Sequence, residues 1–138
     1  MVCHPFSSFF PAFPELKKAE EKGVDVFLPV DSVVADDFSA GANSQNCATA
    51  EIPYGWMGLD IGPDSAERFA EAVRTSKTIL WNGPMGVFEF EKFSNGTFTV
   101  ARALKEATDL GGYTLIGGGD SVAAINAIQL ADQVSYVS

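Results

Sequence analysis

Two glycine-punctuated stretches decide the fold of this chain: Ile79-Leu-Trp-Asn-Gly-Pro-Met-Gly-Val-Phe-Glu-Phe-Glu-Lys-Phe93 and Ile116-Gly-Gly-Gly-Asp-Ser-Val-Ala-Ala124. Each begins with a short apolar run typical of a buried strand and leads into a helical pattern of apolar residues. Open α/β sheets bind ligands in loops of this kind, outside the carboxyl ends of their strands. The two stretches therefore predict both the fold class and the position of a ligand site.

Strand and helix signals alternate along the rest of the chain. Helices are expected over 15–22, 65–75, 93–107 and 121–129, and strands over 24–30, 57–61, 79–81, 113–116 and 134–137. Residues 31–56 are predicted to be mainly irregular, although 32–35 also fits a short strand. Strands that alternate with helices imply a parallel sheet with right-handed crossovers. We therefore predict an α/β, Rossmann-like fold in which helices cover both faces of a parallel sheet.

Composition limits the partners. The 138 residues fit one small domain, and their 46% hydrophobic content is enough for a core. Eighteen acidic and nine basic side chains give a net charge of -9, which argues against nucleic acid and membrane partners. Lys105 is the last basic residue. An anion bound by residues 106–138 must then be held by backbone amides, a metal ion or groups outside this stretch.

The first thirteen residues and the cysteines carry little functional signal. Cys3 and Cys47 do not suggest a disulfide framework, which favours a reducing compartment. His4, the single histidine, is expected to be a solvated terminal residue. Residues 1–13 lack the basic and unbroken apolar regions of a signal peptide, so an unrelated start is favoured over a vestigial targeting segment. No apolar run approaches the length of a membrane span.

The triple-glycine stretch is typical of a phosphate site. Glycines let the backbone approach a ligand closely, and the following helix presents free amides and a positive dipole end. Asp120 would repel a phosphate unless a divalent cation lay between them, and Mg²⁺ commonly binds one or two carboxylates plus substrate phosphates. On this loop alone, the simpler interpretation, in which the glycines turn the chain and Asp120 caps a helix, is slightly favoured.

Spacing excludes two familiar nucleotide signatures. A dinucleotide fingerprint would need glycine where Val122 stands, and the Gly-Lys-[Ser/Thr] of a P-loop does not occur. An oxidoreductase domain with an atypical NAD loop is a third alternative, which Val122 and Asp120 disfavour.

The other stretch is typical of a base and sugar site. Gly83 and Gly86 can admit a flat heterocycle, Phe88 can form a wall, and the Glu89 carboxylate can accept hydrogen bonds from ribose hydroxyls. Taken alone, this stretch fits an Asn-Gly-Pro turn with a solvated glutamate better.

Together with Trp56-Met-Gly-Leu-Asp-Ile-Gly62, the stretches Trp81-Asn-Gly-Pro-Met-Gly-Val-Phe-Glu89 and Gly117-Gly-Gly-Asp-Ser-Val-Ala-Ala124 closely resemble the C-terminal, nucleotide-binding domain of phosphoglycerate kinase. The resemblance covers 14–138, and residues 1–13 do not follow the family. It implies a partial domain, incomplete relative to the full family domain, of an enzyme that transfers a phosphoryl group reversibly between 1,3-bisphosphoglycerate and ADP in glycolysis.

The resemblance also implies roles for individual residues. Gly58 and Gly83 would line the adenine pocket, with Met85 and Phe88 close by, and Glu89 would hold the ribose. Asp120 would bind the Mg²⁺ of ADP or ATP, and Ser121 with the glycine amides would bind a phosphate. The residues expected to hold the nucleotide are Gly58, Asn82, Gly83, Met85, Phe88, Glu89, Gly117, Gly118, Gly119, Asp120 and Ser121, with Asp120 as the metal ligand.

The resemblance places other parts of the reaction outside these residues. The family supplies cations from an N-terminal half, which also holds 3-phosphoglycerate, and from an upstream glycine-rich segment of the nucleotide domain. No catalytic residue is therefore assigned in this chain. A non-catalytic nucleotide-binding module or truncated product is the alternative. Full-length members are expected to be monomeric and cytoplasmic, with plastid members also possible.

Overall fold

The computed structural model describes residues 14–138, so the predictions for Cys3, His4 and the opening segment fall outside the described residues. Its elements are α1 (Pro14–Glu21), β1 (Asp31–Ala35), β2 (Ser44–Ala48), β3 (Met57–Ile61), α2 (Pro63–Arg74), β4 (Thr78–Asn82), α3 (Asn95–Asp109), β5 (Tyr113–Gly117), α4 (Gly119–Ala127) and β6 (Tyr136–Val137), with short 3-10 turns at η2 (Thr49–Glu51), η3 (Glu91–Phe93) and η4 (Ala131–Gln133).

Three strands form a parallel sheet in the order β4-β5-β6. Thr78 pairs with Tyr113 at one end of β4, and Asn82 pairs with Gly117 at the other. The crossovers between these strands contain α3 and α4. The predicted α/β class and parallel sheet are therefore confirmed.

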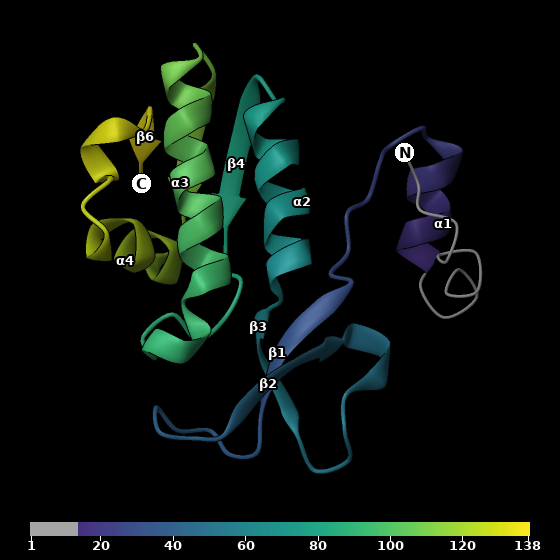
Figure 1. Cartoon of the computed structure of the whole chain (residues 1–138). Helices are drawn as coiled ribbons and strands as arrows, with labels where there is room; N and C mark the ends of the chain where they lie inside the picture. Colours follow the sequence, from purple (N-terminus) through teal and green to yellow (C-terminus); the bar gives the residue numbers. More distant parts are fainter. Residues whose placement is uncertain (1–13) are drawn as a thin grey trace.

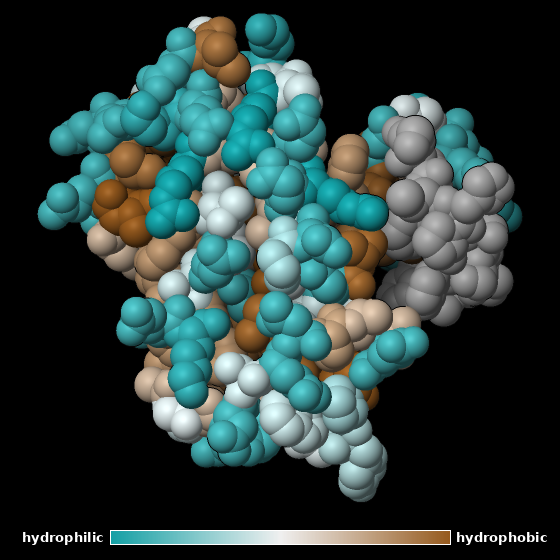
Figure 2. All heavy atoms as spheres, viewed as in Figure 1, coloured by the Kyte–Doolittle hydropathy of each residue, from teal (hydrophilic) through white to brown (hydrophobic). Residues whose placement is uncertain are grey.

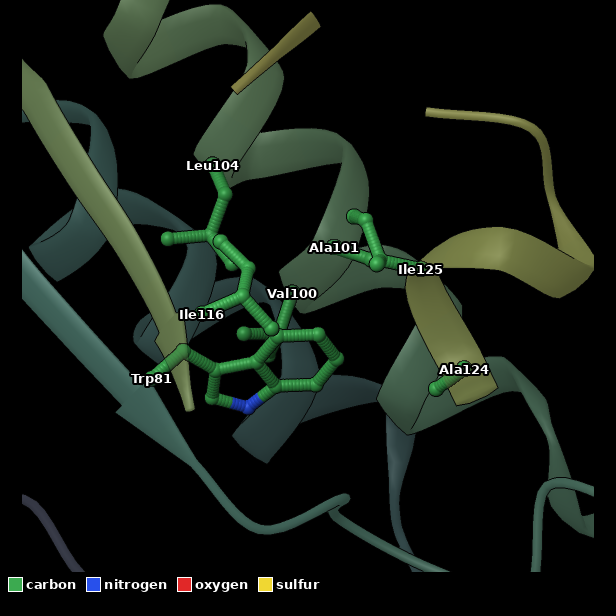
Figure 3. Close-up of a cluster of buried hydrophobic side chains, with 7 residues drawn as sticks. All are labelled: Trp81, Val100, Ala101, Leu104, Ile116, Ala124 and Ile125. Atoms are coloured by element: carbon green, nitrogen blue, oxygen red, sulfur yellow. The ribbon is translucent and has the colours of Figure 1, made fainter. Parts of the chain in front are cut away.

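Helices α3 and α4 share one core with this sheet. Val100, Ala101 and Leu104 recur on one face of α3, as the apolar positions of an amphipathic helix do. They pack with Trp81 of β4, Ile116 of β5, and Ala124 and Ile125 of α4, as Figure 3 shows. A single cluster that includes both helices places them on the same face of the sheet.

The opposite face of the parallel sheet carries exposed apolar side chains. Leu80 is 68% exposed, Tyr113 51% and Tyr136 54%. The sequence predicts helices on both faces, but in residues 14–138 the helices that pack on this sheet, α2, α3 and α4, all lie on the face that holds Trp81 and Ile116. In Figure 2, which views the molecule from the side of α2 and α3, hydrophilic residues predominate over those two helices.

A second, antiparallel sheet in the order β2-β1-β3 lies beside α2 (Figure 1). Residues 31–56, predicted to be mainly irregular, thus contain two paired strands, and 32–35 is confirmed as part of β1. Sequence signals missed β2 because Ser44-Gln-Asn-Cys-Ala48 is polar and largely exposed, so only its pairing with β1 identifies it. The strand predicted at 57–61 is confirmed, but it pairs antiparallel to β1.

The strand predicted over residues 24–30 is wrong, because these residues form no ladder. Val24 and Phe27 are 54% and 52% exposed, and β4 lies at the edge of its sheet without a neighbour on its outer side in the part described. An apolar run becomes a strand only where a partner strand satisfies its backbone groups. The run here lacks that partner.

Aspartates of the antiparallel sheet cap the two long helices. The Asp31 carboxylate accepts hydrogen bonds from the amides of Asp64 (3.0 Å) and Ser65 (2.8 Å) in the first turn of α2. The Asp60 carboxylate accepts one from the Gly96 amide (2.9 Å) in the first turn of α3. Helix N-termini leave amides without intrahelical partners and favour negative charge, so both contacts join the sheet to the helices. None of the helices in residues 14–138 is long and apolar enough to cross a membrane.

Candidate functional site

The two predicted loops meet at the carboxyl ends of the strands of the parallel sheet. Strands β4 and β5 end in register at Asn82 and Gly117, so the residues that follow emerge side by side. The Gly83 amide donates a 2.6 Å hydrogen bond to Oγ of Ser121, which lies 38 residues further along the chain. The stretches identified from sequence therefore lie next to each other and form one candidate site.

The glycine loop leads directly into the N-terminus of α4. Gly118 has φ +91°, and a Cβ there would lie 2.5 Å from Oδ1 of Asn82, so the fold itself requires glycine. Gly119 is different, because a Cβ there would meet nothing within 4 Å and its backbone is not left-handed. The fold does not need a glycine at this position, whereas close approach of a ligand would.

The first turn of α4 offers backbone donors. Its first amides cannot form intrahelical bonds, and no side chain caps this end of the helix. The first internal bond of this turn runs from the Val122 amide to the Gly118 carbonyl. The amides of Gly119, Asp120 and Ser121 are thus available to an anion, which the helix dipole also favours.

Asp120 lies exposed in this first turn. Within residues 14–138, its carboxylate makes no hydrogen bond or ion pair. Residues 14–138 contain no group of three or more histidine, cysteine, aspartate or glutamate side chains that could hold a metal ion on their own. A single free carboxylate beside an anion site fits a cation that takes its remaining ligands from phosphate and water, as Mg²⁺ commonly does.

Ser121 is completely buried, and its hydroxyl accepts the Gly83 amide. A hydroxyl has one proton to donate and two lone pairs. What Ser121 can offer a phosphate is therefore its remaining proton and its backbone amide, while its oxygen joins the two loops.

Three further hydrogen bonds hold the loop that follows β4. The amides of Met85 and Gly86 donate to Oγ1 of Thr97 in α3, at 3.1 and 3.2 Å. The Val87 amide donates to the Leu59 carbonyl of β3 at 2.8 Å. A Cβ on Gly86 would lie 2.5 Å from that same carbonyl, so the loop is pressed against β3.

The remaining predicted residues lie around this loop. Met85 and Phe88 are half-buried, and the Phe88 ring packs 6.3 Å from that of Phe98 in α3. Glu89 is exposed. Gly58 directly precedes Leu59, whose carbonyl accepts the Val87 amide. A Cβ added to Gly58 would meet only Cδ1 of Ile52, at 3.8 Å. Gly58 thus adjoins the Gly83–Glu89 loop through β3, whereas Asp120 is connected to that loop through Ser121.

Sequence analysis missed two buried residues beside the site. Thr97 fell within the expected apolar face of a helix, and Asp60 lay within a predicted strand. Both residues could have been noticed in the sequence, because each is polar and occupies a position where the surrounding apolar pattern predicts burial. Burial raises the pKa of Asp60 from 3.8 to about 6, although hydrogen bonds from the amides of Gly96 and Ile61 oppose that rise.

An apolar cavity of about 270 Å³ lies behind the site, between α2, α3 and β4. Met85 is the predicted site residue that reaches it. Its walls contain no acidic or basic side chain, so it offers nothing to a charged ligand. The lining residues are Phe27, Phe69, Ala72, Val73, Ile79, Leu80, Trp81, Met85, Val100 and Leu104.

Comparisons with known proteins agree on one family. The family model described as phosphoglycerate kinase matches residues 12–138. Phosphoglycerate kinase 3, cytosolic, of Arabidopsis thaliana is 56% identical over 123 residues, which are 89% of this chain and 31% of that protein. Phosphoglycerate kinase of Nostoc punctiforme is 56% identical over 121 residues, covering 88% of this chain and 30% of the relative. The chain thus spans less than a third of the length of these relatives.

Solved structures support the same relationship. Phosphoglycerate kinase from Coxiella burnetii superposes with a TM-score of 0.86 at 39% identity, covering 95% of this chain and 33% of that protein. The enzyme from Pyrococcus horikoshii gives a TM-score of 0.63 at 28% identity, over 96% of this chain and 33% of that one. Shared sequence and shared backbone extend over nearly all described residues. The chain belongs to the phosphoglycerate kinase family.

Proposed function

We propose that residues 14–138 are part of the nucleotide-binding domain of a phosphoglycerate kinase and bind ADP or ATP together with Mg²⁺. In the whole enzyme, this part would serve reversible phosphoryl transfer between 1,3-bisphosphoglycerate and ADP, which gives 3-phosphoglycerate and ATP. One observation carries the proposal: the Gly83–Ser121 hydrogen bond joins a loop suited to a base and a sugar to a loop suited to phosphates.

The phosphate end of the nucleotide would lie at the start of α4. The free amides of this turn and the uncrowded backbone at Gly119 suit a closely bound phosphate. Asp120 would hold Mg²⁺ against the phosphate oxygens. When bound, the ion neutralises charge on the phosphates. The residues themselves orient the phosphate chain through fixed backbone donors.

The base and sugar would lie over the preceding loop. Gly58 and Gly83 leave room for a flat ring beside the main chain, and Met85 and Phe88 provide apolar surface. Asn82 is the last residue of β4, directly before this loop. The exposed Glu89 carboxylate is available to accept hydrogen bonds from the ribose hydroxyls.

Phosphoryl transfer also needs cationic groups that stabilise the charge of the transition state. Residues 106–138 contain none. Arg74 is engaged by Glu67 and Glu106. We therefore assign no catalytic residue here and propose that the phosphoglycerate and the missing cations are supplied by other parts of a whole enzyme. We also propose that this enzyme is monomeric and works in the cytosol, because the name of the Arabidopsis relative describes it as cytosolic.

Calorimetric titration with ADP, with and without Mg²⁺, tests the nucleotide site. The unchanged chain should bind Mg-ADP more tightly than ADP alone, and Asp120→Ala should remove that difference. Asp132→Ala, which removes an exposed acid just beyond α4, is the matched control and should retain it. Equal weakening of ADP and Mg-ADP by Asp120→Ala would contradict the metal role.

Gly119→Ala tests the phosphate role independently of the metal. The added methyl group meets open space in the structure, so the fold should be unaffected, but the methyl would occupy the path of a closely bound phosphate. ADP affinity should fall while thermal stability is retained. Unchanged affinity would mean that the phosphate does not approach this residue.

The lack of basic side chains in residues 106–138 favours a second candidate, nucleotide binding without turnover. A coupled assay of the chain alone separates the two candidates. Turnover would eliminate the second, and Mg-ADP binding without turnover would support it.

A further inference from the structure

One threonine outside the two motifs holds the proposed base and sugar loop in place. Oγ1 of Thr97 accepts the consecutive amides of Met85 and Gly86, at 3.1 and 3.2 Å. Its residue is completely buried, so no water competes for these bonds. A hydroxyl oxygen has two lone pairs, and here each receives one amide.

The position of Thr97 is itself tightly determined. It lies in the first turn of α3, directly after Gly96, whose amide donates to Asp60. A Cβ on Gly96 would collide with the side chains of Asp60 and Ile61, so the helix end is packed closely against β3. The backbone that carries the Thr97 hydroxyl is therefore held in place relative to β3.

The loop needs such an external support. Gly83 has φ +110°, and Gly86 is a second glycine within four residues, although the ring of Pro84 fixes φ at the position between Gly83 and Met85. Its hydrogen bonds to other elements fall at three places: Ser121 at Gly83, Thr97 at Met85 and Gly86, and Leu59 at Val87. Of these, the Thr97 contact holds the middle of the loop, where an adenine and a ribose would rest.

We infer that Thr97 is a positioning residue for nucleotide binding, which fixes the Met85–Gly86 backbone in the conformation that accepts the base and sugar without touching the nucleotide. The inference rests on the proposed function. It concerns the adenosine end of the ligand. The phosphate end would be bound by α4, and the Thr97 hydroxyl makes its hydrogen bonds with the loop after β4 and none with α4.

The test compares Thr97→Val with Thr97→Ser. Valine keeps the shape but leaves two amides without an acceptor, whereas serine keeps the oxygen. Thr99→Val is the matched control, since residue 99 is about 200° further around the same helix. Mg-ADP and Mg-pyrophosphate affinities are measured by calorimetry for each chain, together with thermal stability and amide hydrogen exchange at Met85 and Gly86.

Thr97→Val should speed exchange at Met85 and Gly86 and raise the Kd for Mg-ADP about tenfold or more, while the Kd for Mg-pyrophosphate changes less than about twofold. Thr97→Ser and Thr99→Val should behave like the unchanged chain. Parallel weakening of both ligands, or no weakening of Mg-ADP, would overturn the inference.

If Thr97→Val does not fold, Thr97→Ala replaces it, and failure of both to fold would overturn the inference by showing a purely structural role. If the unchanged chain binds neither ADP nor pyrophosphate, the proposed function fails. Failure of the inference alone leaves Mg-ADP binding by the unchanged chain intact.

Discussion

Asp60 shows at the scale of one residue how a carboxylate can be kept in an apolar interior. It is 5% exposed, and two backbone amides donate to it, from Gly96 and Ile61. These bonds and the N-terminus of α3 favour the ionised form, but burial outweighs them and raises the pKa of Asp60 to about 6. The residue thus changes charge at a pH at which other aspartates are already ionised.

The raised pKa of Asp60 predicts a specific dependence of stability on pH. Because the folded pKa of about 6 exceeds the ordinary 3.8, the stability that Asp60 contributes is fully present below pH 3.8 and is lost as the pH rises through 6. Asp60→Asn keeps the size and an acceptor but cannot ionise. Relative to this variant, the unchanged chain should lose about 3 kcal/mol of unfolding free energy between acidic and neutral pH.

Urea denaturation of both chains at several pH values measures this difference. Other titrating groups cancel in the comparison because they occur in both chains. A difference that does not vary with pH would show that Asp60 has an ordinary pKa in the folded protein.

Sequence analysis singled out candidate site residues only where a motif marks them. Gly118 and Asp120 stand in a motif, and the structure places them in the loop and the first turn expected. Thr97 could not be found in this way, because its importance comes from a contact across 11 or 12 residues with a loop whose path depends on tertiary packing. A threonine on an apolar helix face signals burial but does not identify its partner.

Helix α2 depends on a cap that lies outside the helix. Its N-cap residue, Gly62, has no side chain to bond the first amides, and Asp31 of β1 performs this role instead. Burial raises the pKa of Asp31, but the Ser65 hydroxyl and the amides of Ser65 and Asp64 outweigh it and hold the pKa below 3.8. Ser65 also accepts the amides of Val30 and Asp31, so strand and helix are joined in both directions.

We expect Asp31→Ala to lower the free energy of unfolding by about 1 to 2 kcal/mol at neutral pH, as the loss of a helix cap does. Because the folded pKa is depressed, this stability is present above pH 3.8 and is lost as the pH falls through the lower folded value. The difference from the unchanged chain should therefore shrink in strong acid. Asp37→Ala, at an exposed position of the neighbouring turn, should change stability by less than about 0.5 kcal/mol in the same denaturation experiment.

Elements with a strong internal pattern were predicted from sequence, and elements defined by a partner were not. The spacing of Asp64 and Glu67 predicts a helix start at 65, two residues after α2 begins. Helix α3 carries apolar residues at helical spacing, and β4 and β5 are short apolar runs. Strand β2 has no such pattern and exists through its ladder with β1. Residues 24–30 are the opposite case, because their pattern is that of a strand and no partner strand pairs with them in the described structure.

At the scale of the whole molecule, the parallel sheet has one covered and one exposed face. Leu80, Tyr113 and Tyr136 make the exposed face apolar. Apolar surface of this kind favours association between molecules, and within residues 14–138 the outer edge of β4 adds backbone groups without a partner strand. We therefore expect the isolated chain to self-associate through this face.

The comparison of Leu80→Ser with Leu110→Ser tests that expectation. The two leucines are 68% and 67% exposed, but Leu110 lies at the end of α3, away from the sheet face. Sedimentation velocity should show less self-association for Leu80→Ser than for Leu110→Ser at equal concentration. Equal association of the two variants would show that the exposed sheet face is not the contact.

The bond between Gly83 and Ser121, together with the pairing of Asn82 with Gly117, sets a fixed spacing between two distant parts of the chain. An insertion in the turn after α3, at Leu110–Gly112, would leave this spacing unchanged. One extra residue between Asn82 and Gly83, or between Gly117 and Ser121, would displace the Gly83 amide from the Ser121 hydroxyl while the strands stay paired. Contacts between the two loops therefore constrain loop length at the carboxyl ends of β4 and β5. The turn after α3 is constrained separately, because the amides of Gly112 and Tyr113 donate to the carbonyls of Ala107 and Lys77.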